Sequence, residues 1–527
     1  MASFLDSIGY NLWVLPALLA IPLVGAVIVL MLPVREPAAT AAGVETPAAR
    51  QVALWLFVLE FVVSIGLWWS FNPADTGWQA PIDIGWIPTW GVRFTLGVDG
   101  IALMMVLLTT FIMPLSVLGS WTTIRTKVRS YYALLLILTT GMLGVFLARD
   151  LFLFYVMWEV MLVPMYFIIG VWGGERRIYA NLKFFIYTML PSLLMLVAII
   201  YLGLHMKGAD GTPDFSYDRL LTGAVGMPER TALWLFAAFF LAFAVKVPIF
   251  PFHTWLPDAH VEAPTAGSVI LAGIMLKMGT FGFLRFALPL FPGAAMNPTI
   301  RMIILILALI GIIYGALVAM VQPDFKKLVA YSSVSHLGFV MLGIFALTLQ
   351  SVQGALMVMI NHGISTGALF LLVGIMYERR HSRLIDSYGG IARVAPMFAA
   401  ILTFVSLSSI GLPGTNGFVG EFLVLIGSFR TYPVLTIIAT TGVIFAAVYL
   451  LWAIQRILFN PLDKAENEHL TDLNKRELAM LVPLVAAIIW LGVYPAPVLR
   501  RMEGSAQLLV NRVERAGSLP RVSEAGR

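Results

Sequence analysis

Residues 246–265 read KVPIFPFHTWLPDAHVEAPT, and this stretch interrupts a segment that is otherwise apolar. The residues before it, 231–245, are almost entirely aliphatic or aromatic, which is typical of a helix that crosses a bilayer. Pro248 and Pro251 each remove a backbone donor and disturb the preceding turn, so they predict a break in that helix. Non-helical backbone is tolerated at membrane depth only where protein or a polar cavity covers it. The stretch therefore predicts a broken helix beside an ion site.

The composition of the whole chain agrees with a membrane protein. Of the 527 residues, 60% are hydrophobic and 12% are charged, whereas soluble domains average about 45–50% and about 25%. Apolar runs recur along the whole length and are too long and too regular for barrel strands. We expect an all-α polytopic membrane protein with about 14 transmembrane helices. The expected spans are 12–32, 52–71, 96–120, 131–148, 150–172, 182–204, 231–250, 264–290, 301–321, 327–347, 354–377, 395–428, 433–458 and 478–499.

Lysine and arginine in the loops predict the orientation. The expected loops carry 17 of these residues on one side and seven on the other, excluding a tail after Leu499 that adds six arginines to the poorer side. The richer side should be cytoplasmic, which puts both termini on the outer face. The first span lacks a basic start, so we expect it to be retained and not cleaved as a signal peptide. No basic cluster is interleaved with aromatics, which argues against nucleic acid as a partner.

A second interruption, GLPGTNG at 411–417, precedes Glu421 within another expected span. Glu159 lies 87 residues before Lys246, and His336 lies 85 residues before Glu421. Such similar spacing favours two five-helix repeats, and an odd helix number gives them opposite orientations. We expect helices 1–3 in residues 1–130, the repeats in 131–290 and 301–458, and the last helix and tail in 459–527. The residues at matching positions of the two repeats differ, so a coincidental similarity of the two spacings is the alternative.

Four charged residues, Glu159, Lys246, Lys277 and Glu421, lie inside expected spans. A charge at the bilayer centre costs about 2.5–3.5 kcal/mol and usually faces the bundle interior or a water-filled path. A proton or ion relay explains such residues, and a purely structural ion pair is the alternative. Lys183 is different because it lies near a helix start, where we expect it to reach the interface.

Histidines supply further candidate proton carriers. His336 and His362 are flanked by serine and asparagine, and imidazole can donate on one nitrogen while accepting on the other. A relay role and a hydrogen-bonded core role are about equally compatible with them. His253 and His260, with Asp258, superficially suggest a metal site, but Pro257 interrupts the geometry. We expect no metal there, and instead a role in the helix break or a water path.

The absence of cysteine excludes disulfides, cysteine-ligated iron–sulfur clusters and thiolate zinc sites. No nucleotide-binding loop, nucleophile elbow or flavin fingerprint is convincing. The chain is therefore expected to conduct ions and not to carry out bond chemistry.

Over residues 95–460 the chain resembles the antiporter-like membrane subunits of respiratory complex I, the NADH–quinone oxidoreductase. The motif at 246–265 carries this resemblance, together with DFKKLVAYSSVSH at 324–336. Subunits of multi-component sodium/proton antiporters share both motifs. Glu421, where the sister L and N subunits have lysine, points to the M class, the equivalent of mitochondrial subunit 4. The short chain after the last span, with no room for a long lateral helix, points the same way.

The resemblance implies a site and a setting. Glu159 and Lys246 would form the input-side pair, Lys277 with His336 and His362 the central relay, and Glu421 the exit. His253, Asp258, His260 and Lys326 would be auxiliary. NADH, FMN, iron–sulfur clusters and quinone are expected in partner subunits, with none in this chain. The expected partners are the other complex I membrane subunits, including flanking sister subunits, and the lipid bilayer, most simply that of a bacterial inner membrane. A sodium/proton antiporter subunit and a scaffold with only structural charges are the competing functions.

Overall fold

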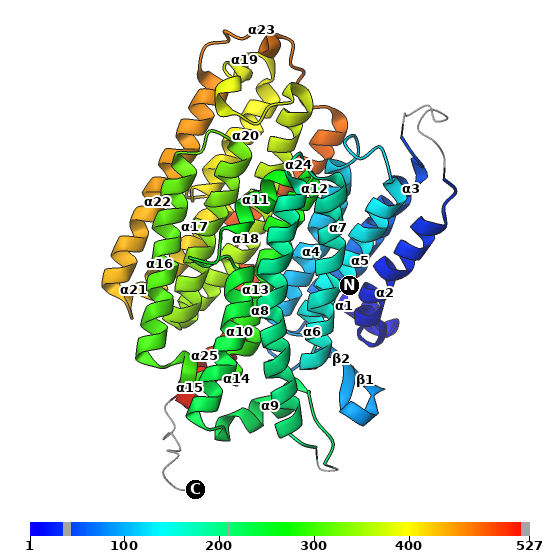
Figure 1. Ribbon diagram of the computed structural model, residues 1–527, viewed down its shortest axis with the longest axis vertical. Helices are drawn as coiled ribbons and strands as arrows, with labels where there is room; N and C mark the ends of the chain where they lie inside the picture. The colour runs from blue at the N-terminus through cyan, green and yellow to red at the C-terminus, as the bar shows by residue number, and fades with distance from the viewer. Residues whose placement is uncertain (35–43, 209–210, 518–527) are drawn as a thin grey trace.

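The computed structural model describes residues 1–34, 44–208 and 211–517 (Figure 1). Within these residues, 12 helical segments are long and apolar enough to cross a membrane. They are α2 (Tyr10–Met31), α3 (Ala48–Ser70), α4 (Gly100–Gly119), α5 (Val128–Leu147), α6 and α7 (Leu151–Val160 and Leu162–Trp172), α8 (Arg177–His205), α12 to α14 (Thr265–Leu290), α16 (Pro298–Met320), α17 (Phe325–Ala346), α18 (Leu349–Arg380), α22 with η7 (Pro433–Phe459) and α24 (Lys475–Val493). The expectation of a polytopic helical membrane protein is confirmed.

The two expected broken spans are divided into shorter helices. The first consists of α10 (Glu229–Lys246) and α11 (Trp255–Glu262), and the second of α20 (Pro396–Ser409) and α21 (Asn416–Phe429). The seventh expected span, 231–250, ran to residue 250. α10 ends at Lys246 because Pro248 cannot continue the helix. In the second break, Gly411 and Gly414 have φ values of 79° and 92°, which residues with a side chain rarely adopt.

A β-hairpin departs from the all-α expectation. Strands β1 (Gln79–Ile87) and β2 (Val92–Val98) pair antiparallel between α3 and α4. The expected third span began at residue 96, which was wrong because residues 96–98 belong to β2. Asp99 ends the strand and caps α4, since its Oδ1 accepts from the backbone N–H of Ala102 at 2.9 Å.

The tail after the last span also forms a helix, α25 (Ala496–Gly517), which the sequence analysis did not expect. It packs against α4, α14 (Leu288–Leu290), α15 (Pro292–Ala295) and α18. The Oγ of Ser505 accepts from the first N–H of α4, at Gly100, at 3.0 Å. The hairpin, α9 (Tyr217–Gly223), α15 and α25 gather at one end of the bundle, called here the hairpin end (Figure 1). α19 (Ile391–Val394) and α23 (Ala465–Glu468) lie at the opposite end.

The core of the bundle is formed by the helices that carry the candidate site. The apolar windows of α18 and of the Thr265–Leu290 helix are 100% buried, and that of α17 is 94% buried. Outer helices such as α3, α22 and α24 are only 33% buried, as expected for helices that face lipid or other chains. α18 contacts α17, α20, α21 and the Thr265–Leu290 helix, so residues far apart in sequence meet around it.

Candidate functional site

Lys277 lies in the middle of the fully buried Thr265–Leu290 helix, which is not a regular α-helix. Two π-helical segments, η4 (Leu271–Met275) and η5 (Phe283–Ala287), flank α13 (Leu276–Gly282), on which Lys277 sits. A π segment widens the helix and often marks a functional site. The side chain of Lys277 is completely buried, and its Nζ donates to the carbonyl of Ala272 within η4. A carbonyl in the widened turn thus accepts a hydrogen bond from the ammonium group.

The second partner of Lys277 is a histidine on α18. The distance from Lys277 Nζ to His362 Nδ1 is 2.6 Å, and the histidine is 4% exposed. An ammonium group can only donate, so Nδ1 accepts this bond and the proton of a neutral His362 ring lies on Nε2. That Nε2 atom is buried and has no hydrogen-bond partner in the described residues.

His336, on α17, is the next titratable side chain after His362. Its ring centroid lies 5.8 Å from that of His362, with the planes at 62°. Its Nδ1 is 2.8 Å from Oε1 of Glu421, on α21, and both side chains are less than a tenth exposed. The Nε2 of His336, like that of His362, is buried without a partner among the described residues. Four titratable groups from four segments, Lys277, His362, His336 and Glu421, are thus in sequential contact.

A small polar cavity lies between the two histidines and Glu421. Its volume is about 20 Å³, which is enough for a water molecule. The lining includes hydroxyl and amide groups of Ser365, Ser408 and Asn361. Ser365 and Ser408 hydrogen-bond at 2.8 Å, while the Oδ1 of Asn361 is buried without a partner in the described chain. A water molecule here would have the polar neighbours that a buried water requires.

Lys246 and Glu159 are not joined directly. Nζ of Lys246 lies 5.2 Å from the ring centroid of Trp158 and 5.8 Å from that of Phe184. Glu159, which is partly buried, instead accepts from Ser192 Oγ at 2.6 Å. Within the described chain no direct ion pair or hydrogen bond joins Glu159 to Lys246, and their role as an input-side pair stays a prediction. The ammonium at the end of α10 thus lies beside Trp158, the residue that precedes Glu159 in sequence.

Two of the four auxiliary residues, His260 on α11 and Lys326 at the start of α17, are buried at the end of the broken segment. His260 is fully buried and stacks on Phe370, at a 4.7 Å centroid separation and 9° between planes. Neither ring nitrogen of His260 has a partner in the described chain. Lys326 donates to the carbonyls of Ala263, at 2.6 Å, and of Val261.

The other two auxiliary residues have different surroundings. His253 stacks on Phe250 and contacts Tyr314 edge-on. Asp258 forms an ion pair of 2.8 Å with Lys183. Lys183 thus has a carboxylate partner on α11, and the expectation that it reaches the interface stays a prediction. In the described ranges no group of three or more histidines, cysteines or carboxylates could hold a metal ion.

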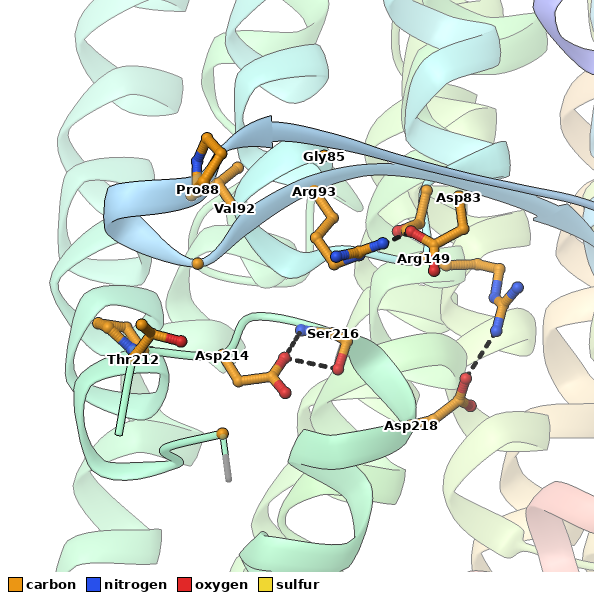
Figure 2. Close-up of a pocket in the computed structure, with 14 residues that line it drawn as sticks. Asp83, Gly85, Pro88, Val92, Arg93, Arg149, Thr212, Asp214, Ser216 and Asp218 are labelled. Carbon is orange, nitrogen blue, oxygen red and sulfur yellow. Dashed lines mark hydrogen bonds and ion pairs between the residues drawn. The ribbon is translucent and has the colours of Figure 1, made fainter. Parts of the chain in front are cut away.

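A much larger cavity lies elsewhere, at the hairpin end, with a volume of about 650 Å³ (Figure 2). Its charged side chains pair with one another: Arg93 with Asp83, and Arg149 with Asp218, each at 2.7 Å. Asp214 accepts from the N–H and the Oγ of Ser216. None of the six relay candidates lines this cavity. The contiguous line of titratable groups, and not cavity size, therefore identifies the candidate site.

Sequence analysis missed two buried charges in expected spans. Glu60, on α3, is 0% exposed, and both of its carboxylate oxygens lack a hydrogen-bond partner in the described chain. Arg285, two turns beyond Lys277, forms a 2.6 Å ion pair with Asp99. The signal that identified the first four charges, an ionisable residue inside an apolar run, applies equally to these two. If Glu60 were ionised and unpaired at the bilayer centre, its charge would destabilise the chain by about 2.5–3.5 kcal/mol.

Fold and site together define a class: polytopic helical membrane proteins with a line of titratable residues across buried, interrupted helices. The family model described as "NADH:quinone oxidoreductase/Mrp antiporter, TM" matches residues 148–493. NADH-quinone oxidoreductase subunit M of Rhodobacter capsulatus is 47% identical over 459 residues, covering 85% of this chain and 88% of the relative. NADH-ubiquinone oxidoreductase chain 4 of Chondrus crispus is 41% identical, with 93% and 96% coverage. The chain belongs to the family of complex I antiporter-like membrane subunits that these two relatives represent.

Solved structures agree with this assignment. A chain of respiratory complex I from Thermus thermophilus with bound NADH superimposes with a TM-score of 0.84 and 32% identity, covering 95% of this chain and 99% of that chain. A chain of the Mrp complex from Dietzia sp. has a TM-score of 0.80, with 96% and 99% coverage, but only 17% identity. The second similarity shows a shared fold. The resemblance stated from the two sequence motifs is thereby confirmed.

Proposed function

We propose that this chain conducts protons through the membrane domain of a respiratory NADH:quinone oxidoreductase. The observation that carries the proposal is the line of contacts Lys277–His362–His336–Glu421, whose first and last links are hydrogen bonds of 2.6 and 2.8 Å. Each member can hold or release a proton, and each reaches the next directly or across the small cavity. Structural roles alone would not require four titratable groups in one line.

The direction of transfer follows from the chemistry of the groups. Lys277 gives a proton to His362 Nδ1, and the ring passes its Nε2 proton toward His336 across the cavity. His336 then passes a proton to Glu421 through the Nδ1–Oε1 contact. Reorientation of the rings, or of a water molecule between them, resets the line for the next proton. Glu159, on α6, and Lys246, at the end of α10, supply Lys277 once Lys246 leaves the rings of Trp158 and Phe184.

The setting of the chain belongs to the same proposal. Other complex I membrane subunits flank it, and partner subunits bind NADH, FMN, iron–sulfur clusters and quinone. Quinone reduction in those partners drives the proton transfer. The 12 long segments and the two interrupted ones give 14 crossings, arranged as two inverted five-helix repeats with both termini on the outer face of a bacterial inner membrane. The similar spacing of the two Glu/Lys and His/Glu pairs supports the repeats.

Glu421→Gln in the assembled oxidoreductase tests the function. Glutamine keeps the size of the side chain and a hydrogen-bond acceptor for His336 but cannot carry a proton. We expect proton uptake by inverted membrane vesicles to fall at least about tenfold, with normal assembly. Unchanged proton pumping in assembled complexes would favour the scaffold function. Pumping of sodium in place of protons, by a chain isolated without redox partners, would favour the antiporter function.

A further inference from the structure

Glu60 is a buried glutamate that does not belong to the proposed relay. It belongs to the inward-facing stripe of α3, together with Phe57, Ser64 and Leu67, all of which are buried. Leu59 and Val62, on the opposite face of the same helix, are 50% and 60% exposed. The carboxyl group therefore points into the chain and not toward lipid.

No positive charge on the packed helices lies near Glu60. α3 packs against α1 (Ala2–Ser7), α2, α4 and α5. α2 and α4 contain no lysine, arginine, aspartate or glutamate, and α1 contributes only Asp6. On α5, Arg129 is at the first turn and donates to the carbonyls of Leu30 and Leu32. Arg50, on α3 itself, is ten residues away, about 15 Å along the helix, and donates to Trp121.

The tyrosines on these helices do not reach the carboxyl either. Tyr10, on α2, donates to the carbonyl of Val63. Tyr132, on α5, shares a 3.2 Å hydrogen bond with Ser120, and Tyr131 OH has no partner in the described residues. A carboxylate without a counter-ion or a donor is unstable in such surroundings, whereas a carboxylic acid is tolerated.

A polar contact between α3 and α4 lies one turn from Glu60. Ser64 and Thr110 share a 2.7 Å hydrogen bond, which fixes the register between α3 and α4. Because the two helices are antiparallel, Glu60, one turn before Ser64, is level with Pro114, one turn after Thr110. Pro114 has no N–H, so the carbonyl of Thr110 lacks its helical partner. Neither carboxyl oxygen of Glu60 has a hydrogen-bond partner among the described residues.

We propose that Glu60 is a proton-binding site of the membrane domain, separate from the relay and occupied at neutral pH. It lies across α4 from the relay helices, since α4 packs on one side against α3 and also contacts α12 (Thr265–Ile270), η4 and α18. Charges in a protein interior are weakly screened, so a proton that arrives at Lys277 or His362 disfavours a second one at Glu60. The site can thus release its proton in response to the charge state of the relay.

Infrared spectroscopy of the complete oxidoreductase in nanodiscs tests the site. At about pH 8, solvent-exposed carboxyl groups are ionised, because their ordinary pKa values lie near 4. We expect a carboxylic-acid C=O band that survives at this pH, and we expect Glu60→Gln to remove intensity equal to one carboxyl. Glu175→Gln, at an exposed loop position, is the matched control and leaves the band unchanged.

The outcome that overturns the proposal is an acid band identical in Glu60→Gln and the unaltered complex, or a loss of carboxylate intensity in its place. If the glutamine variant fails to assemble, Glu60→Asp takes its place. The aspartate variant shifts the band if Glu60 is protonated and leaves it untouched if it is ionised. A band that disappears when sodium replaces potassium in the buffer would also overturn the assignment, because it would identify a cation site.

Discussion

Replacing Lys277 with methionine removes the donor at the start of the proposed line while keeping the length of the side chain. Lys277 Nζ is 2.6 Å from His362 Nδ1, and both groups are buried. A hydrogen bond to a charged group contributes about 1.5–3 kcal/mol. Since about 1.4 kcal/mol corresponds to a factor of ten, the equilibrium for placing a proton on His362 changes by about 10- to 150-fold. We therefore expect proton transfer through this chain to slow by at least about tenfold.

The assay compares NADH-driven acidification of inverted vesicles with NADH oxidation by an artificial electron acceptor, which reports assembly. Lys277→Arg separates charge from proton transfer, because arginine keeps the positive charge but does not deprotonate in proteins. We expect both variants to lose pumping while oxidation with the artificial acceptor is retained. Lys207→Met, at an exposed position, is the control. A normal proton-to-NADH ratio in either Lys277 variant would refute the relay.

Two further predictions concern stability. Arg379→Met removes the 2.7 Å ion pair of Glu477, whose side chain is 3% exposed, and leaves this carboxylate only Arg476 at 3.6 Å. It should therefore cost more than Lys183→Met, at the more exposed pair with Asp258, which should cost less than about 1 kcal/mol. Thermal denaturation midpoints that fall equally would contradict this ranking. Burial raises the pKa of Asp150, between α5 and α6, from 3.8 to about 6, so the folded chain binds this proton more tightly than the unfolded chain and stability decreases as the pH rises through that interval. Asp150→Asn should flatten the change in thermal midpoint between about pH 4 and pH 6, and an unchanged pH dependence would show that another group is responsible.

Hydrophobic runs were sufficient to predict most of the membrane spans, because a bilayer requires about 20 apolar residues in a helix. The same signal misplaced the start of the third span. Val92, Phe94 and Leu96 alternate with other residues along β2, and this period of two distinguishes a strand from the helix that follows Asp99.

The chemistry of the site was accessible from sequence, but its contacts were not. Lys277 and His362 are 85 residues apart, and only the packing of α18 against the Thr265–Leu290 helix brings them together. Glu159 and Lys246, which the resemblance makes the input-side pair, form no direct ion pair in the described chain, where the lysine lies beside the rings of Trp158 and Phe184. The proton-carrying roles of all six residues remain predictions.

The helix α25 has a consequence for biosynthesis. Arg501 donates to the carbonyl of Trp68, and Ser505 accepts from the N–H of Gly100, so the final segment of the chain binds groups made several hundred residues earlier. During translation these two hydrogen bonds cannot form until α25 has left the ribosome. A polypeptide truncated before α25 would thus leave the carbonyl of Trp68 and the N–H of Gly100 without these partners.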